Sequence, residues 1–427
     1  MTESDKPRLR EAERRQITLQ AMDFEALVAP DDPVRGLWAM VEALDLSEFY
    51  AAIEARGSTP GAPATDPKIL LALWLYANVE GISSARLLAK LCERDAPYRW
   101  ICGGVSVNHH GLADFRVAHG RKLDKLLTQV IASMMKLGVV KLKRVAQDGM
   151  KVRASAGAAS FRRRQSLDRC YEEAKEQVRK LKREIEEDGS ASSRRERAAR
   201  ERAAAERQAN IEAALETMAE LEKKQADPGR QCPSVVKRRK EVRASTTDAE
   251  CRVMKMPDGG FRPAYNVQFA TDESGAIVGA DVTNEGTDYA QVEPMLDQIE
   301  ERTGAVPGEY LVDGGYMKLE NIEVVSERGA RPYAPAHTWK KKAIDPYEPK
   351  AGDSPAVAAW RVRMKSEDGK RVYKQRAALA ERTNADLRGH RKLDRLNVRG
   401  HVKVKAVVLL GALAFNLLRL RAAGGLT

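Results

Sequence analysis

Cysteines, nucleotide-binding loops and catalytic histidine arrangements are all scarce or missing in this sequence. The five cysteines stand far apart and form no Cys-x-x-Cys pair, which argues against a disulfide framework and against a zinc ribbon. The glycine pairs at 103–104 and 259–260 read as turns, so no nucleotide cofactor is expected. No Ser-His-Asp or Cys-His arrangement can be read among the six histidines. Hydrolases with a serine or cysteine nucleophile are therefore disfavoured.

Long apolar stretches are also missing. The longest, 406–418, follows Lys403 and Lys405 and is shorter than the ~20 residues that span a bilayer, so it predicts a buried core helix. The first residues are charged throughout and lack the apolar segment of a signal peptide. We therefore expect a cytoplasmic, nucleoid-associated protein with no membrane partner.

Basic residues are abundant. The 427 residues include 73 Lys and Arg against 61 Asp and Glu, which gives a net charge of +12 and a pI near 9.4. A length of this size predicts two or three domains. The basic excess favours a polyanionic partner, nucleic acid before membrane, although a solvated basic surface is the alternative.

The first 138 residues read as short helices. Asp66 and Pro67 form a helix start before the apolar run 69–76. Further helices are expected after Ser84 and over 123–137. We expect an all-α N-terminal domain, 1–138, that binds DNA; a bundle that only packs on its neighbour is equally consistent with the pattern.

The segment 161–243 differs in composition from the rest. Over 161–225 it is rich in Arg, Glu, Lys and Ala, with narrow apolar stripes on both sides of a break at 188–192. This pattern predicts an inserted antiparallel helical hairpin, which returns at a basic cluster, 237–240. Its charges are either solvated helix faces or a surface for DNA or self-association.

The remaining segments, 139–160 and 244–427, alternate between strands and helices. Strands are predicted over 139–148, 264–271, 276–283, 309–312 and 331–334, and helices over 288–303 (capped by Asp288), 373–388 and 402–420. This order is similar to the ribonuclease H-like α/β arrangement, a mixed sheet with crossover helices, here interrupted by the hairpin.

Three acidic residues are the candidate catalytic groups. Asp148 and Asp313 are expected at the ends of neighbouring strands, and Glu381 on the later helix would join them. Three convergent carboxylates in a basic protein suit two-metal phosphoryl transfer with Mg²⁺, or Mn²⁺ as a substitute. Each acid alone has a plainer interpretation: Asp-Gly is usually a turn, and a Glu on a basic helix usually forms a surface ion pair.

These motifs resemble those of the DDE-type insertion-sequence transposases, in particular the group with a Tyr-Arg-Glu-Lys signature. The resemblance rests on Asp148-Gly149 followed by Lys151 and Ala154, on 313–316 (Asp-Gly-Gly-Tyr), and on Glu381 with Arg388 seven positions later. Weaker matches are 263–268, the tail 399–418 and the helical stretch 66–115.

The resemblance implies a transposase that binds terminal inverted repeats, cleaves DNA with Mg²⁺ and transfers the strand to a target, as a homodimer or larger assembly. Asp148, Asp313 and Glu381 would bind the metal. Tyr316 would hold a flipped base or else pack under its own helix, and Arg388 would contact a phosphate or else pair with Asp386 or Glu381. A catalytically degenerate DNA-binding protein and a nuclease on the same fold are the alternatives.

One spacing departs from the family pattern. The signature places three residues between Arg and Glu, whereas four separate Arg376 from Glu381. In an α-helix the extra residue turns Arg376 by about 100° from its expected direction, so Lys374 is a substitute for its phosphate contact. Glu367 and Asp368 are the fallback candidates for the third acid.

Overall fold

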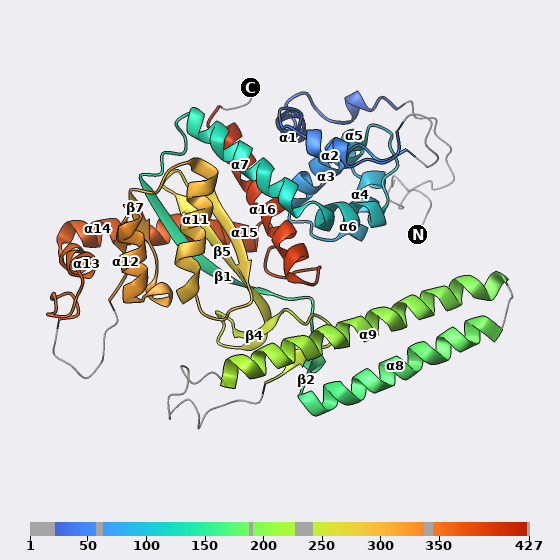
Figure 1. Cartoon of the computed structure of the whole chain (residues 1–427). Coiled ribbons are helices and arrows are strands. Elements are labelled where there is room, and N and C mark those ends of the chain that lie inside the picture. The colour runs from blue at the N-terminus through green and yellow to red at the C-terminus, as the bar shows by residue number, and fades with distance from the viewer. Residues whose placement is uncertain (1–21, 57–62, 188–190, 227–241, 337–344, 425–427) are drawn as a thin grey trace, which may run out of the picture.

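The computed structural model describes residues 22–56, 63–187, 191–226, 242–336 and 345–424 (Figure 1). Its N-terminal part is helical, as predicted. Asp66 accepts a hydrogen bond from the Lys68 amide at 2.8 Å and Pro67 begins the next helix, which confirms the predicted start. After a 3₁₀ turn the helices are α1 (Pro33–Glu42), α2 (Ser47–Ala51), α3 (Pro67–Val79), α4 (Ala85–Arg94), α5 (Ala96–Cys102), α6 (His109–Ala118) and α7 (Gly120–Lys136).

A mixed sheet forms the centre of the second half, so the predicted α/β class is confirmed. Along the sheet the order is β4-β5-β1-β7-β8, with β6 also paired to β5. β1 is antiparallel to β5 and parallel to β7, and β7 is parallel to β8. The strands are β1 (Arg144–Arg153), β4 (Arg252–Lys255), β5 (Phe261–Asp272), β6 (Ile277–Thr283), β7 (Glu309–Leu311) and β8 (Arg331–Tyr333).

Two details of the strand prediction were wrong. The first strand begins at Arg144 and runs on to Arg153, so Asp148 lies in its middle and not at its end. Asp288 does not cap a helix with its side chain; it precedes a 3₁₀ turn (Tyr289–Gln291), and α11 (Val292–Thr303) begins after that turn. The Asp288 carboxylate is used elsewhere, as described below.

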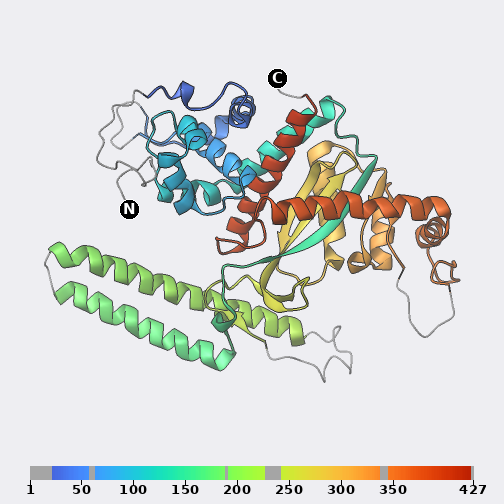
Figure 2. The same ribbon diagram turned by 180° about the vertical axis from the view of Figure 1, so that it is seen from behind.

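Helices cover both faces of the sheet. On one face lie α11 and α12 (Leu319–Glu327), and across the other runs a continuous helical rod, seen from behind in Figure 2. The rod consists of α14 (Glu367–Arg376), a π-helical turn η7 (Ala377–Glu381) and α15 (Arg382–Gly389). It is preceded by α13 (Pro355–Lys365), which the sequence analysis missed although Ser354 and Pro355 form an N-terminal cap signal.

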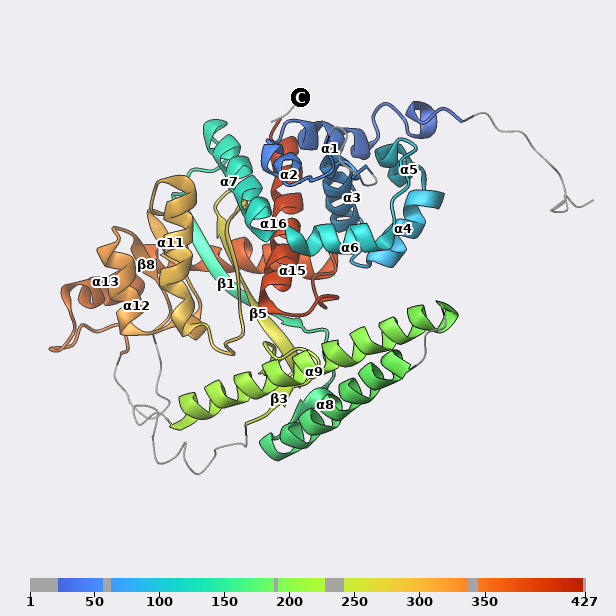
Figure 3. The ribbon, with the colours of Figure 1, turned by 45° about the vertical axis from the view of Figure 1, so that its right-hand side comes forward.

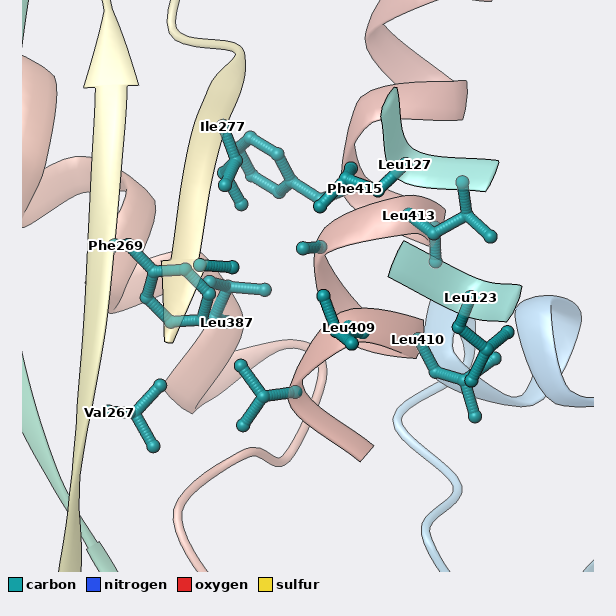
Figure 4. Close-up of a cluster of buried hydrophobic side chains, with 14 of the residues drawn as sticks. Leu123, Leu127, Val267, Phe269, Ile277, Leu387, Leu409, Leu410, Leu413 and Phe415 are labelled. Carbon is teal, nitrogen blue, oxygen red and sulfur yellow. The ribbon is translucent and has the colours of Figure 1, made fainter. Parts of the chain in front are cut away.

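The last helix, α16 (His401–Ala422), joins the two halves. By length and composition it could cross a membrane, but it packs against α7, α3 and α6 on one side and β6 on the other. Figure 4 shows Leu409, Leu410, Leu413 and Phe415 of this helix between side chains of α7 and those of β5, β6 and α15. The predicted core helix is therefore confirmed.

The predicted helical hairpin is present and projects from the body of the protein (Figures 1 and 3). Its arms are α8 (Arg164–Glu187) and α9 (Ala191–Ala226). At its base β2 (Phe161–Arg162) pairs with β3 (Ala244–Ser245), so the chain leaves and re-enters the body at one point. The basic cluster at 237–240 lies outside the described residues.

Candidate active site

Two of the three predicted acids face the same space from neighbouring strands. In the parallel pairing of β1 with β7, Ala146 lies opposite Leu311, so two residues further on Asp148 and Asp313 are at the same level. Asp148 is still within β1 and is paired with Phe269 of β5. Asp313 lies two residues after the end of β7, and its carboxylate accepts a hydrogen bond from the Gly315 amide at 2.7 Å.

The surroundings of Asp148 make its negative charge costly. Burial, and next the charge of Asp313, raise the pKa of Asp148 to about 6 against the opposing effect of Arg376. Its Oδ1 accepts the Gly149 amide at 2.9 Å, and its Oδ2 accepts the Asn384 side-chain amide at 3.0 Å. A positive group placed here would therefore stabilise the ionised form.

Arg376 is such a group, and the structure corrects its predicted position. Five residues along an α-helix turn by about 500°, which would leave Arg376 and Glu381 about 140° apart. The π-turn Ala377–Glu381 absorbs the extra residue, because each residue of a π-helix turns by a smaller angle. The Arg376 guanidinium consequently donates to Glu381 Oε1 at 2.7 Å. Lys374 is not needed to replace it.

The electrostatics of Arg376 agree with this position. Burial alone would lower the pKa of Arg376, but the nearby groups Tyr373, Asp148, Asp313 and Glu381 together raise it. Its side chain is only 14% exposed. The arginine thus supplies positive charge to all three predicted acids.

Glu381, the third predicted acid, is held differently. Its side chain is 57% exposed and is paired with Arg376. Within the described residues no group of three or more His, Cys, Asp or Glu side chains is arranged to hold a metal ion. The structure therefore brings Asp148 and Asp313 near Arg376, while Glu381 is exposed and paired with that arginine.

The fallback acids lie apart from this arrangement. Glu367 and Asp368 occupy the first turn of α14, where each pairs with a cation three residues later, Lys370 and Arg371. Their side chains are 90% and 80% exposed. These are surface ion pairs, so Glu381 remains the better third acid.

Tyr316, the predicted site residue with two alternative roles, is buried. It is 1% exposed, and its hydroxyl donates to Gln268 Oε1 inside the protein. Its burial agrees with the packing alternative, and the role of holding a flipped base stays a prediction. The alternation of β-strand side chains places its partner Gln268 on the face opposite to Asp148.

Behind the two aspartates lies a polar network that the sequence analysis missed. Its centre is Asp288, whose carboxylate accepts from Lys151 at 3.1 Å, Asn266 at 2.6 Å and Gln268 at 2.8 Å. Gln268 also binds Gln147 at 3.0 Å. The signal was present, since Lys151, 263–268 and Tyr316 all belong to the family-like motifs, but their shared partner could not be read from spacing.

This network explains the glycine after Asp148. A Cβ at Gly149 would lie 2.5 Å from Asp288 Oδ1 and 2.6 Å from the Gln268 amide. Any other residue would therefore push Asp288 away from β1. The Asp-Gly pair is a packing requirement inside the strand and not a turn.

Arg388 lies two turns beyond Glu381 on α15 and is partly buried. Neither alternative partner holds it: Asp386 pairs with Arg391 at 2.9 Å, and Glu381 pairs with Arg376. The described part of the chain shows no hydrogen bond or ion pair for Arg388. Its cation is thus available to a ligand.

Comparison with protein families connects this geometry with a function. Residues 22–118 match a transposase domain (DUF772), and residues 348–421 match a transposase DDE domain. The chain therefore carries two transposase domains, the second of them a DDE domain. The second match contains the helical rod with Glu381, and the first covers most of the N-terminal helices. No curated protein and no solved structure shows significant similarity to the chain.

A DDE transposase domain acts with divalent metal ions, and the site can be tested for such a fit. Asp148 and Asp313 provide hard oxygen donors at a place where burial and mutual repulsion disfavour their charge. In addition, the Oδ1 atom of Asn384 is buried and has no hydrogen-bond partner among the residues that the structure describes. The donor chemistry therefore fits a small divalent cation, with Glu381 as the acid that must still join.

Proposed function

We propose that this transposase cleaves DNA at the ends of its element and transfers the freed strand to target DNA, with Asp148, Asp313 and Glu381 as its three acids. The observation that carries the proposal is the β1–β7 register, which sets Asp148 and Asp313 at one level with Arg376 facing both. Repelling carboxylates beside a buried arginine are typical of a phosphoryl-transfer site.

The roles of the residues follow from their contacts. Asp148 and Asp313 would hold Mg²⁺ from the sheet, and Glu381 would join them by leaving its exposed ion pair, a bond worth about 0–1 kcal/mol. Arg376 would then be free to bind a phosphate oxygen, as would Arg388, because a guanidinium offers two parallel donors. When bound, the ion would supply Lewis-acid activation of the attacking water or 3′-hydroxyl.

The arrangement of the chain supports three parts with different functions. We propose that 1–138 is the DNA-binding domain, that 139–160 and 244–427 form a ribonuclease H-like catalytic domain, and that 161–243 is an insertion. The strand order with antiparallel β1, β5 and β6 followed by parallel β7 and β8 supports the catalytic domain, and the β2–β3 neck supports the insertion. Cutting two transposon ends together requires at least a dimer on double-stranded DNA in the cytoplasm.

The alternatives are weaker on these contacts. The displaced arginine was the sequence argument for a degenerate DNA-binding protein, and the π-turn returns Arg376 to Glu381. A nuclease would share the acids but would not join strands. Joining of specific ends therefore separates the transposase from the nuclease.

The test is Mg²⁺-dependent cleavage and strand transfer on duplexes that carry the inverted repeats flanking the gene. We expect the wild type to cut and join these ends, and Asp148→Asn, Asp313→Asn and Glu381→Gln each to lose at least 10³-fold in rate. Cleavage of any duplex without joining would support the nuclease. Binding of the ends without cleavage by the wild type would contradict the proposed chemistry.

A further inference from the structure

Asn384 belongs to none of the motifs described above. It lies on α15 one turn after Glu381, on the same face of the rod, and its side-chain amide donates to Asp148 Oδ2 at 3.0 Å. Resting on the proposed function, we infer that Asn384 is an additional ligand of the divalent ion, through its amide oxygen.

The first argument is the unsatisfied oxygen. Asn384 Oδ1 is buried and has no hydrogen-bond partner in the described part of the chain. A buried acceptor without a partner costs about 1–3 kcal/mol. The amide carries this cost next to the Asp148 carboxylate, and turning toward a cation bound there would give its oxygen a partner.

The second argument is the distance. Two ligand atoms at right angles on an octahedral Mg²⁺ with bonds of 2.0–2.1 Å are about 3.0 Å apart. The Asn384 amide nitrogen is 3.0 Å from Asp148 Oδ2. Rotating the amide by half a turn exchanges its nitrogen and oxygen, so the oxygen comes to a ligand position beside Asp148 with little other movement.

The third argument is charge. Asp148 and Asp313 face the same space from neighbouring strands, so their negative charges repel each other when both are ionised. A neutral oxygen donor adds a ligand to the ion without adding a further negative charge to the metal-free protein. While no ion is bound, the same amide presents its N–H₂ to Asp148 and stabilises the carboxylate.

The experiment measures metal binding to the full chain without DNA. Mn²⁺ affinity is determined by calorimetry, and the number of waters on bound Tb³⁺ by luminescence decay in H₂O and D₂O. We expect Asn384→Leu to weaken Mn²⁺ binding about 10-fold and to add about one bound water, and Asn384→Asp to keep or increase the affinity. Asn397→Leu, an exposed amide near Ser83, is the matched control and is expected to bind as the wild type does.

Unchanged affinity and hydration in Asn384→Leu would overturn the inference. Weaker binding in both Asn384→Leu and Asn384→Asp would also overturn it, because that result assigns Asn384 only a donor role toward Asp148. Asp148→Asn separates this inference from the proposed function. If that variant still binds Mn²⁺ as the wild type does, the proposed metal site itself is wrong, whereas loss of binding there with unchanged Asn384→Leu rejects only the role of Asn384.

Discussion

Asp148 lies within strand β1 and Asp313 just beyond the end of β7, whereas Glu381 lies on a helix that is wound locally into a π-turn. Asp148 is fixed by the pairing of β1 with two neighbouring strands, β5 and β7, and the Asp288 network supports β1 from behind. Glu381 is exposed and is held by one ion pair with Arg376. The site thus combines a rigid half that sets the distance between two acids with an adjustable half that brings the third.

The two halves should respond differently to the loss of one residue. Deleting Ala146 from β1 would turn the following side chains to the opposite face of the sheet or break the pairing of β1 with β5 and β7. We therefore expect the cooperative unfolding transition to be lost. Deleting Ala378 converts the π-turn into an α-turn and restores an i, i+4 spacing of Arg376 and Glu381, so we expect a change within about 1 kcal/mol. Thermal melts followed by circular dichroism measure both. An unfolded Ala378 deletion would show that the π-turn has a structural role beyond absorbing one residue.

Removing charge from the rigid half should stabilise the metal-free protein. The folded-state pKa of Asp148 is raised to about 6 from an ordinary value of 3.8, so the folded state binds the proton more tightly than the unfolded state does. Stability is therefore lost as the pH rises from about 4 to about 6, by up to about 3 kcal/mol. We expect Asp148→Asn to be more stable than the wild type by that order at pH 8, and the difference to vanish near pH 4.

Urea unfolding with EDTA across this pH range measures the effect. Glu381→Gln is the control for the adjustable half, since Glu381 is exposed and its pair contributes little. An Asp148→Asn variant that is less stable than the wild type at pH 8 would mean that neither burial nor the charge of Asp313 disfavours the Asp148 carboxylate in the folded protein.

The buried network should contribute stability and no DNA contact. Tyr316→Phe removes the hydroxyl that donates to Gln268, and we expect a loss of about 1–2 kcal/mol in unfolding free energy. The affinity for DNA, measured by fluorescence anisotropy, should stay unchanged. Tyr289→Phe, whose ring lies near Lys318, is the matched control and should change stability less. A large loss of DNA affinity in Tyr316→Phe at unchanged stability would support the base-stacking role.

The smallest effect on stability is expected at the exposed acid. Glu381→Gln breaks the ion pair with Arg376, and because the glutamate is 57% exposed the cost should stay below about 1 kcal/mol. Cleavage should nevertheless be lost, since the third acid is missing. If Glu381→Gln were as destabilising as Tyr316→Phe, the division into a rigid and an adjustable half would be wrong.

Much of the fold could be predicted from the sequence because its signals are local. The apolar periods of α7, α16 and both hairpin arms, and the alternation in β5 and β6, appear in the structure close to the predicted bounds. The end of β1 at Asp148 and the cap at Asp288 were predicted wrongly. In both cases a carboxylate that looked like a terminus signal accepts hydrogen bonds from residues distant in the sequence.

The site divides in the same way. The sequence pattern predicts the order of the strands, and this order places Asp148 and Asp313 side by side. The contact between Arg376 and Glu381 depends on a π-turn, and no residue type in Ala377–Glu381 predicts a π-turn there. The convergence of Lys151, Asn266 and Gln268 on Asp288 depends on three-dimensional packing, so spacing along the chain could not predict it.

The most direct test of the central claim is to map the metal site by iron-dependent backbone cleavage. Fe²⁺ would replace Mg²⁺ in the full chain, and ascorbate with peroxide would cut the polypeptide next to the bound ion. We predict cuts near Asp148, near Asp313 and within 376–388, three segments that are distant in the sequence, and suppression of all three by excess Mg²⁺. Cuts at other places, or cuts near Asp148 and Asp313 that persist in the Asp148→Asn variant, would contradict the account.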